Sequence, residues 1–193
     1  MGLFGKKTSK KIEQLDDLIF DLNADINIKS RQIEQADKKA RDLMKKAIGA
    51  PNSSKQLIAA QVQGFYSSAR STQRAVSYKI AVYSAATAIK SSYEAQELET
   101  EGALKALKKI VGAKTMSDLS HSIRDLAKGE QKIGIRLAGL AEQIEQSQDA
   151  LSASSEMNNS NFMSIMTELE SLPPEKIDDA LNSRLKVADP LRS

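Results

Sequence analysis

The sequence contains no cysteine, so neither a disulfide framework nor a thiolate metal site is available to it. Tryptophan is also absent, and aromatic residues make up 4% of the 193 residues, which is little material for a compact globular core. Proline and glycine are scarce, with 4 and 9 residues, and no β-branched run alternates with a period of two. These absences favour an all-α, elongated protein built from long helices.

Long apolar runs are missing as well. No stretch of 18 apolar residues occurs, and the first residues lack the apolar run of a secretory signal. We therefore expect a cytoplasmic protein that reaches a membrane only peripherally, from the cytosolic face.

The net charge of +3 conceals an uneven distribution. Residues 1–136 contain 24 Lys and Arg against 15 Asp and Glu, a charge of +9, whereas residues 137–193 contain 4 against 10, a charge of −6. A basic body favours an anionic partner such as phospholipid or nucleic acid, and an acidic tail can compete for the same surface. The simpler interpretation is two solvated helix faces of unequal charge.

A long helix is predicted over about residues 8–48, because apolar residues recur there every seven positions and again at an offset of three. Lys29 is the single interruption. The apolar positions are Ile12, Ile19, Ile26, Ile33, Ala40 and Ala47, with Leu15, Leu22, Ala36 and Leu43. At 1.5 Å per residue this helix is roughly 60 Å long, so it needs a partner helix to bury its apolar seam.

The partner helix is predicted over about residues 53–111. It follows the breaker cluster 49–52, and Ser53 and Gln56 have the spacing of a capping box. No proline interrupts this range, and its apolar residues step by three and four. We therefore expect a long antiparallel helical hairpin over 8–112, followed by shorter helices.

A third heptad pattern covers residues 115–151, after a Thr115–Asp118 cap. Its apolar positions are Met116, Leu119, Ile123, Leu126, Ile133, Leu137, Leu140, Ile144 and Leu151. Gly129 and Gly134 lie in the middle, and each glycine costs about 0.5–1 kcal/mol in a helix interior relative to alanine. The segment is compatible with one straight helix or with two helices folded about a hinge at these glycines, and a single kinked helix is the simpler interpretation.

The remaining chain divides into a linker with a short amphipathic helix, 152–174, and a separate tail, 175–193. A helix shorter than about 12–15 residues is marginal in water, so the tail is predicted to fold mainly on something else. Ile177, Leu181 and Leu185 share one face that suits a groove between helices. We interpret this tail as dispensable to the core.

The first 11 residues combine an apolar pair with a lysine cluster. They include Leu3 and Phe4, followed by Lys6, Lys7, Lys10 and Lys11. Apolar residues can wedge into a bilayer surface while lysines meet anionic headgroups, each lysine contributing about 1 kcal/mol. A disordered start is an equally good interpretation of these residues alone.

Enzyme chemistry has little support in the sequence. His121 is the one histidine, no nucleophile or metal-ligand pattern accompanies it, and no G-x-S-x-G, H-E-x-x-H or complete P-loop occurs. We expect a protein that is not an enzyme and needs neither metal nor cofactor.

The order of these features resembles that of ESCRT-III subunits, the charged multivesicular body protein family, over essentially the whole chain. The most specific part is the tail, where the family's motif for MIT domains has an acid, a leucine three residues later, and then Arg-Leu. Asp178, Leu181, Arg184 and Leu185 match these four positions. Ala188 and Asp189 depart from the two positions that follow.

The resemblance implies a subunit that polymerises on anionic membranes, alone or with related subunits, and remodels or severs them. It also implies that an AAA ATPase with a MIT domain grips the tail and dismantles the polymer. Two other classes stay open: a soluble coiled-coil or BAR-like scaffold, and a helical protein that binds nucleic acid nonspecifically through phosphate contacts. No specific nucleic-acid partner is expected.

Overall fold

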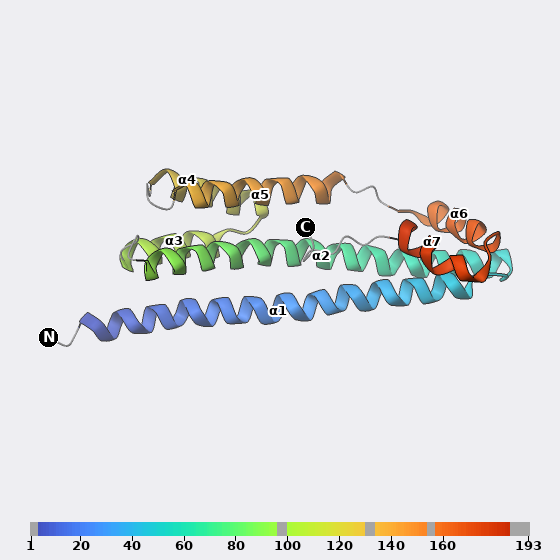
Figure 1. Ribbon diagram of the computed structural model, residues 1–193, viewed down its shortest axis with the longest axis horizontal. Coiled ribbons are helices and arrows are strands. Elements are labelled where there is room, and N and C mark those ends of the chain that lie inside the picture. The colour runs from blue at the N-terminus through green and yellow to red at the C-terminus, as the bar shows by residue number, and fades with distance from the viewer. Residues whose placement is uncertain (1–3, 96–99, 130–133, 154–156, 186–193) are drawn as a thin grey trace. The chain divides into compact units, whose positions relative to one another are not determined.

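The computed structural model describes all residues except 1–3, 96–99, 130–133, 154–156 and 186–193 (Figure 1). Every element in the described part of the chain is helical, which confirms the all-α class. The elements are α1 Phe4–Lys46, α2 Asn52–Glu94, α3 Thr100–Gly112, α4 Met116–Gly129, α5 Gly134–Ala153, α6 Asn159–Glu170, the 3-10 helix η1 Pro174–Lys176, and α7 Ile177–Arg184.

The predicted first hairpin is confirmed: α1 and α2 pack together as an antiparallel pair (Figure 1). Lys90 Nζ lies 2.6 Å from the Asp16 carboxylate, Lys79 pairs with Asp25, and the Tyr66 hydroxyl donates to Asp37 at 3.1 Å. Several residues of the predicted seam are buried: Leu15, Ile26, Ile33 and Ala40 in α1, and Ala47 just after its end. α1 begins at Phe4, earlier than the predicted residue 8.

The second long helix is shorter than predicted. α2 ends at Glu94 and α3 begins at Thr100, where we expected one helix to about residue 111. Glu94 lies at the carboxyl end of α2, where the helix dipole disfavours an acid, whereas Glu101 lies in the first turn of α3, where the dipole favours one. α2 also begins at Asn52, so Ser53 lies inside the helix rather than capping it.

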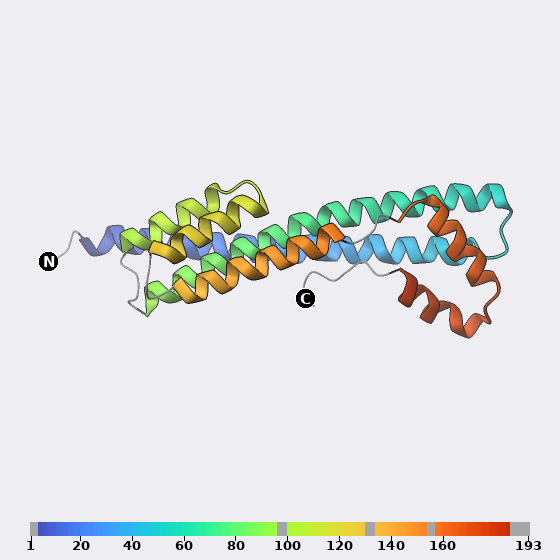
Figure 2. The ribbon, with the colours of Figure 1, turned by 90° about the horizontal axis from the view of Figure 1, so that it is seen from above.

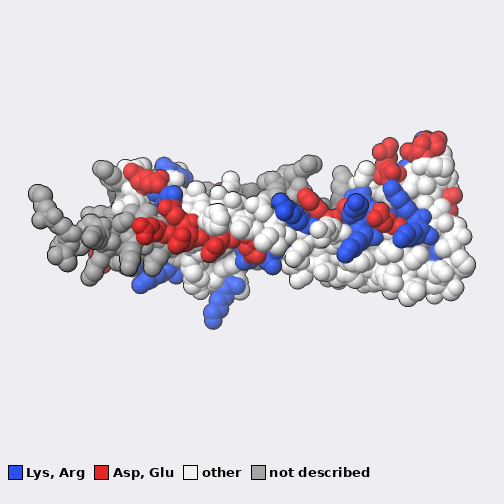
Figure 3. Space-filling model, turned by 90° about the horizontal axis from the view of Figure 1, so that it is seen from below, with Lys and Arg blue, Asp and Glu red and all other residues white. Residues whose placement is uncertain are grey.

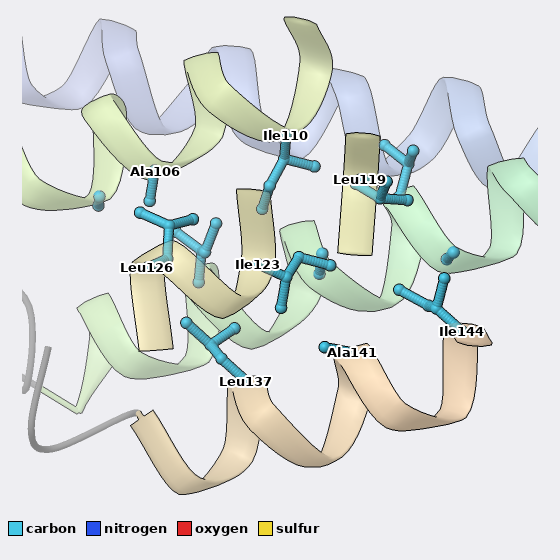
Figure 4. Packing of buried hydrophobic residues seen from close by; sticks show 13 residues of the cluster. Ala106, Ile110, Leu119, Ile123, Leu126, Leu137, Ala141 and Ile144 are labelled. Carbon is cyan, nitrogen blue, oxygen red and sulfur yellow. The ribbon is translucent and has the colours of Figure 1, made fainter. Parts of the chain in front are cut away.

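The chain forms two compact units, and α1 and α2 contribute to both. The first unit contains residues 1–27 and 77–154. Its core joins residues of α2 to residues of α3, α4 and α5, and the side chains labelled in Figure 4 point toward one another from these last three helices. Ala81, Ala85 and Ile89 of α2 are among the buried residues.

The third heptad segment is folded back on itself. α4 and α5 lie side by side and bury their seams together with α3, including Ile123 of α4 and Leu137 of α5 (Figures 2 and 4). The predicted cap is present, because Thr115 Oγ1 accepts a hydrogen bond from Asp118 N at 3.0 Å and Asp118 Oδ2 accepts one from Thr115 N at 3.1 Å. The structure has the folded pair, so the simpler interpretation of a single kinked helix was wrong.

The second unit contains residues 28–76 and 155–193. α6, η1 and α7 lie against the end of the hairpin where α1 turns into α2 (Figures 1 and 2). Gly49 makes this turn possible, since its φ of +75° lies in the left-handed region that side chains disfavour. The predicted short amphipathic helix is α6, which Asn158 caps, with its side chain accepting from Asn161 N at 3.0 Å.

Candidate partner-binding tail

The tail helix α7 is part of the core of the second unit. Leu181 and Leu185 are 1% and 0% exposed, and they share an apolar cluster with Met44 of α1 and Met166 of α6. Burying a leucine side chain completely contributes about 1.5–3 kcal/mol. Our interpretation of the tail as dispensable to the core was therefore wrong, although its apolar face does lie against neighbouring helices as the sequence suggested.

Arg41 makes the polar contacts at the end of α7. Its Nε donates to Asp37 Oδ2 at 2.6 Å, its Nη1 donates to the side-chain oxygen of Asn182, and its Nη2 donates to the backbone carbonyl of Leu185 at 2.7 Å. The last carbonyls of a helix have no partner inside the helix. Arg41 supplies one, and Asp37 holds the guanidinium group in place from one turn away on α1.

Both charged residues of the MIT-type motif have partners within the chain. Asp178 pairs with Lys45 of α1, and Arg184 Nη2 lies 3.0 Å from Glu168 Oε1 of α6. All of these side chains are largely solvent-exposed, so each pair contributes little to stability, typically less than about 1 kcal/mol. The structure thus brings all four predicted motif residues to the hairpin end, where Leu181 and Leu185 are buried and inaccessible to a partner while α7 stays docked.

α6 is anchored by an aromatic contact. The Phe162 side chain is completely buried, and its ring centroid lies 5.4 Å from that of Tyr66 at an interplanar angle of 41°. The Tyr66 hydroxyl donates to Asp37 Oδ1, and burial, followed by the charge of Asp37, raises the pKa of Tyr66. Tyr66 therefore remains a neutral donor and links the α6 contact to the Asp37–Arg41 pair that contacts α7.

Glu170 fixes the other end of α6 to the hairpin turn. Its Oε1 accepts hydrogen bonds from Lys55 Nζ at 2.6 Å and from the Gly49 backbone N–H at 2.9 Å. The hydrogen bond from Lys55, and then that from Gly49, lowers the pKa of Glu170. Lys55 is 8% exposed, which is unusual for a lysine, and its ammonium group is paired as a buried charge must be.

The two predicted hinge glycines end one helix and begin the next: α4 ends at Gly129 and α5 begins at Gly134. A Cβ atom on Gly134 would lie 2.5 Å from the backbone oxygen of Ala127. The close approach of α4 and α5 therefore requires glycine at this position. Ser120 and Arg124 of α4 both donate to the Glu145 carboxylate of α5, which adds polar contacts across the pair.

The predicted membrane-binding start lies mostly outside the description. Leu3 lies outside the described residues. The structure describes only the backbone, as part of α1, for Phe4, Lys6, Lys7, Lys10 and Lys11. Ala188 and Asp189, the departures from the MIT-type motif, also lie outside. Among the helices that are described, none is both long enough and apolar enough to cross a membrane.

The described residues contain no cluster of His, Asp and Glu arranged to hold a metal ion. His121 is exposed on α4, and its Nδ1 lies 2.7 Å from the carbonyl oxygen of Ser117 one turn earlier. The ring therefore engages its own helix, and nothing in its surroundings assigns it a chemical role.

Sequence reasoning missed the residues that receive α6 and the tail. Arg41, Lys45, Lys55 and Tyr66 belong to no motif identified in the sequence. One signal was available: Lys45 and Asp178, and Lys55 and Glu170, are opposite charges at the ends of segments predicted to be amphipathic. Nothing in their sequence spacing, however, shows which acid meets which base.

Comparison with known protein families, characterised proteins and solved structures gives no match for this chain. The geometry alone defines the site: a short amphipathic helix whose apolar face is buried at the end of a helical hairpin, with Asp178 and Arg184 paired to neighbouring helices. Such an arrangement can present the apolar face to a partner only after the helix leaves the hairpin.

Proposed function

We propose that the chain is an ESCRT-III-like subunit that polymerises on anionic membranes and remodels them, and that its tail recruits an AAA ATPase through a MIT domain. The observation that carries this proposal is the burial of Leu181 and Leu185 at the hairpin end. These two leucines belong to the MIT-type motif, so the same apolar face serves either the hairpin or a partner groove.

The structure is then the inactive subunit, with its tail engaged internally. The docked helix has only eight residues, and an isolated helix of that length is marginal in water. Its release consequently exposes an amphipathic segment that folds again on a partner. The basic residues of the N-terminal part contact the anionic membrane, and the acidic C-terminal part competes with the membrane for these basic residues.

The test is calorimetric titration of an ESCRT-disassembling ATPase's MIT domain into the full chain and into a double variant, Leu181→Asp with Leu185→Asp. These substitutions also undock α7, and undocking alone would increase access to the tail. Loss of binding in the variant therefore reports recognition of the two leucines, whereas unchanged or tighter binding contradicts the proposal.

The membrane part is tested separately by electron microscopy of the full chain with anionic and with neutral liposomes. We expect filaments or deformed vesicles on the anionic liposomes, more abundant at low than at high salt, because charge contacts are screened. Bare, intact vesicles under both conditions would favour a soluble helical adaptor instead.

A further inference from the structure

The charge of α1 reverses along the helix. Between residues 13 and 25 all five charged residues are acidic, whereas between residues 29 and 46 seven of the ten are basic. On the face drawn in Figure 3, acidic side chains predominate in one region and basic side chains in another, with some of the opposite sign in each. Since α1 is one continuous helix, the spacing of residues in the sequence determines which of them share a face.

Two large apolar side chains are exposed on this helix, Phe20 at 73% and Ile28 at 56%. Each lies four residues from Ala24, which is also exposed. Asp17 and Arg31 come next, seven residues on either side of Ala24, and both are exposed and make no ion pair within the described part of the chain.

These five residues are separated by steps of three and four, so they form one stripe along the helix. Along the helix, the stripe consists of an acidic, an aromatic, a small, an aliphatic and a basic residue. When two such stripes lie antiparallel, the acid of each meets the base of the other and the apolar residues meet each other. A partner surface of a single charge would attract one end of the stripe and repel the other.

We propose that α1 pairs antiparallel with α1 of a second copy of this chain, about a twofold axis at Ala24. In this register Phe20 faces Ile28 of the second copy and Asp17 faces Arg31, and the symmetry repeats each contact. Ala24 lies at the axis, where its small side chain lets the helices approach closely. A parallel pair in register would place Asp17 against Asp17, which like-charge repulsion disfavours.

This contact is isologous, so it closes on itself and makes a dimer. The paired surface is one face of a single helix, and we expect a dimer that dissociates on dilution because so small an interface holds weakly. The proposal uses only the outer face of α1, and it stands or falls independently of any membrane or ATPase function.

The test uses the absence of cysteine from the chain. Ala24→Cys places a single thiol at the proposed axis, and Ala60→Cys places one on another exposed alanine, on α2. Under mild oxidation of the full chain at equal concentration, Ala24→Cys should form a disulfide-linked dimer at least about tenfold faster, since only its thiols are held face to face. Equal rates would overturn the proposal.

A charge exchange tests the register. Asp17→Arg, added to Ala24→Cys, should slow cross-linking about tenfold or more, because it places arginine against Arg31 of the second copy twice in each dimer. Combining Asp17→Arg with Arg31→Asp should restore the rate. Both residues are exposed, so we expect the substitutions to preserve folding. An unchanged cross-linking rate with Asp17→Arg would refute this pairing. So would a double exchange that fails to restore the cross-linking rate.

Discussion

The guanidinium group of Arg41 donates a hydrogen bond of 2.7 Å to the backbone carbonyl of Leu185, 144 residues later in the chain. Through this bond a residue of the first helix contacts the end of the last one. Leu185 itself belongs to the motif proposed to bind a MIT domain. The state of the tail is therefore set by residues of the hairpin that lie far from it in sequence.

Replacing Arg41 with methionine keeps much of the aliphatic stem but removes three donated hydrogen bonds. Hydrogen bonds to charged groups contribute about 1.5–3 kcal/mol, so we expect the docked state of α7 to lose stability on this scale. Amide hydrogen exchange should show lower protection in α7 and unchanged protection in α4, which belongs to the other unit.

The matched control is Arg74→Met, at an exposed arginine of α2. Its exchange profile should equal that of the natural chain. Equal protection of α7 in the Arg41 variant and in this control would show that Arg41 does not hold the tail.

Phe162 tests the core of the second unit, and the exposed Phe20 is its matched control. Phe162 is completely buried and Phe20 is 73% exposed. Phe162→Ala should destabilise the second unit by about 3–5 kcal/mol, whereas Phe20→Ala should change the free energy of unfolding by less than about 0.5 kcal/mol in dilute solution. Chemical denaturation measures both, and equal effects would contradict the assigned core.

The two glycines Gly134 and Gly139 of α5 should respond to alanine with opposite signs. A Cβ atom at Gly134 meets the Ala127 oxygen at 2.5 Å, whereas one at Gly139 meets nothing within 4 Å. Gly139→Ala should therefore stabilise the chain by about 0.5–1 kcal/mol through helix propensity. Gly134→Ala should lower the melting temperature, because α4 and α5 must separate. Stabilisation by both substitutions would show that the folded pair does not depend on this close contact.

Acid should weaken the attachment of α6 through Glu170. The folded-state pKa of Glu170 lies below its ordinary value of 4.5, mainly because of the hydrogen bond from Lys55, so the unfolded chain binds the proton more readily. The resulting stabilisation is fully present above pH 4.5 and is lost as the pH falls through the folded-state pKa.

Glu170→Gln removes this pH dependence. The difference in unfolding free energy between the natural chain and the variant should be constant above pH 4.5 and should shrink below it. Glu175→Gln, at an exposed residue of η1, is the control and should follow the natural chain. A difference that does not change with pH would contradict the assigned role of Glu170.

The sequence predicted the long hairpin well because a heptad seam such as Ile26, Ile33 and Ala40 needs only local periodicity to be recognised. It could not decide whether Gly129 and Gly134 bend the third segment, because a heptad seam is equally regular in a straight helix and in a folded pair. The choice depends on the approach of Gly134 to Ala127, a contact that exists only in the folded chain.

The candidate site was predicted only in part. Leu181 and Leu185 were recognised as an apolar face, since their spacing is that of one side of a helix. The place where they dock was missed, because it depends on Arg41 and Lys45 meeting residues about 130 to 145 positions away, and no local pattern encodes such pairs.

The most direct test of the account is titration of the MIT domain into the full natural chain and into the Arg41→Met variant. If the docked tail withholds Leu181 and Leu185 from a partner, the variant should bind at least about tenfold more tightly, in proportion to the 1.5–3 kcal/mol by which its docked state is weakened. Equal affinity for the two chains would mean that the hairpin does not restrain the tail, and would contradict the account.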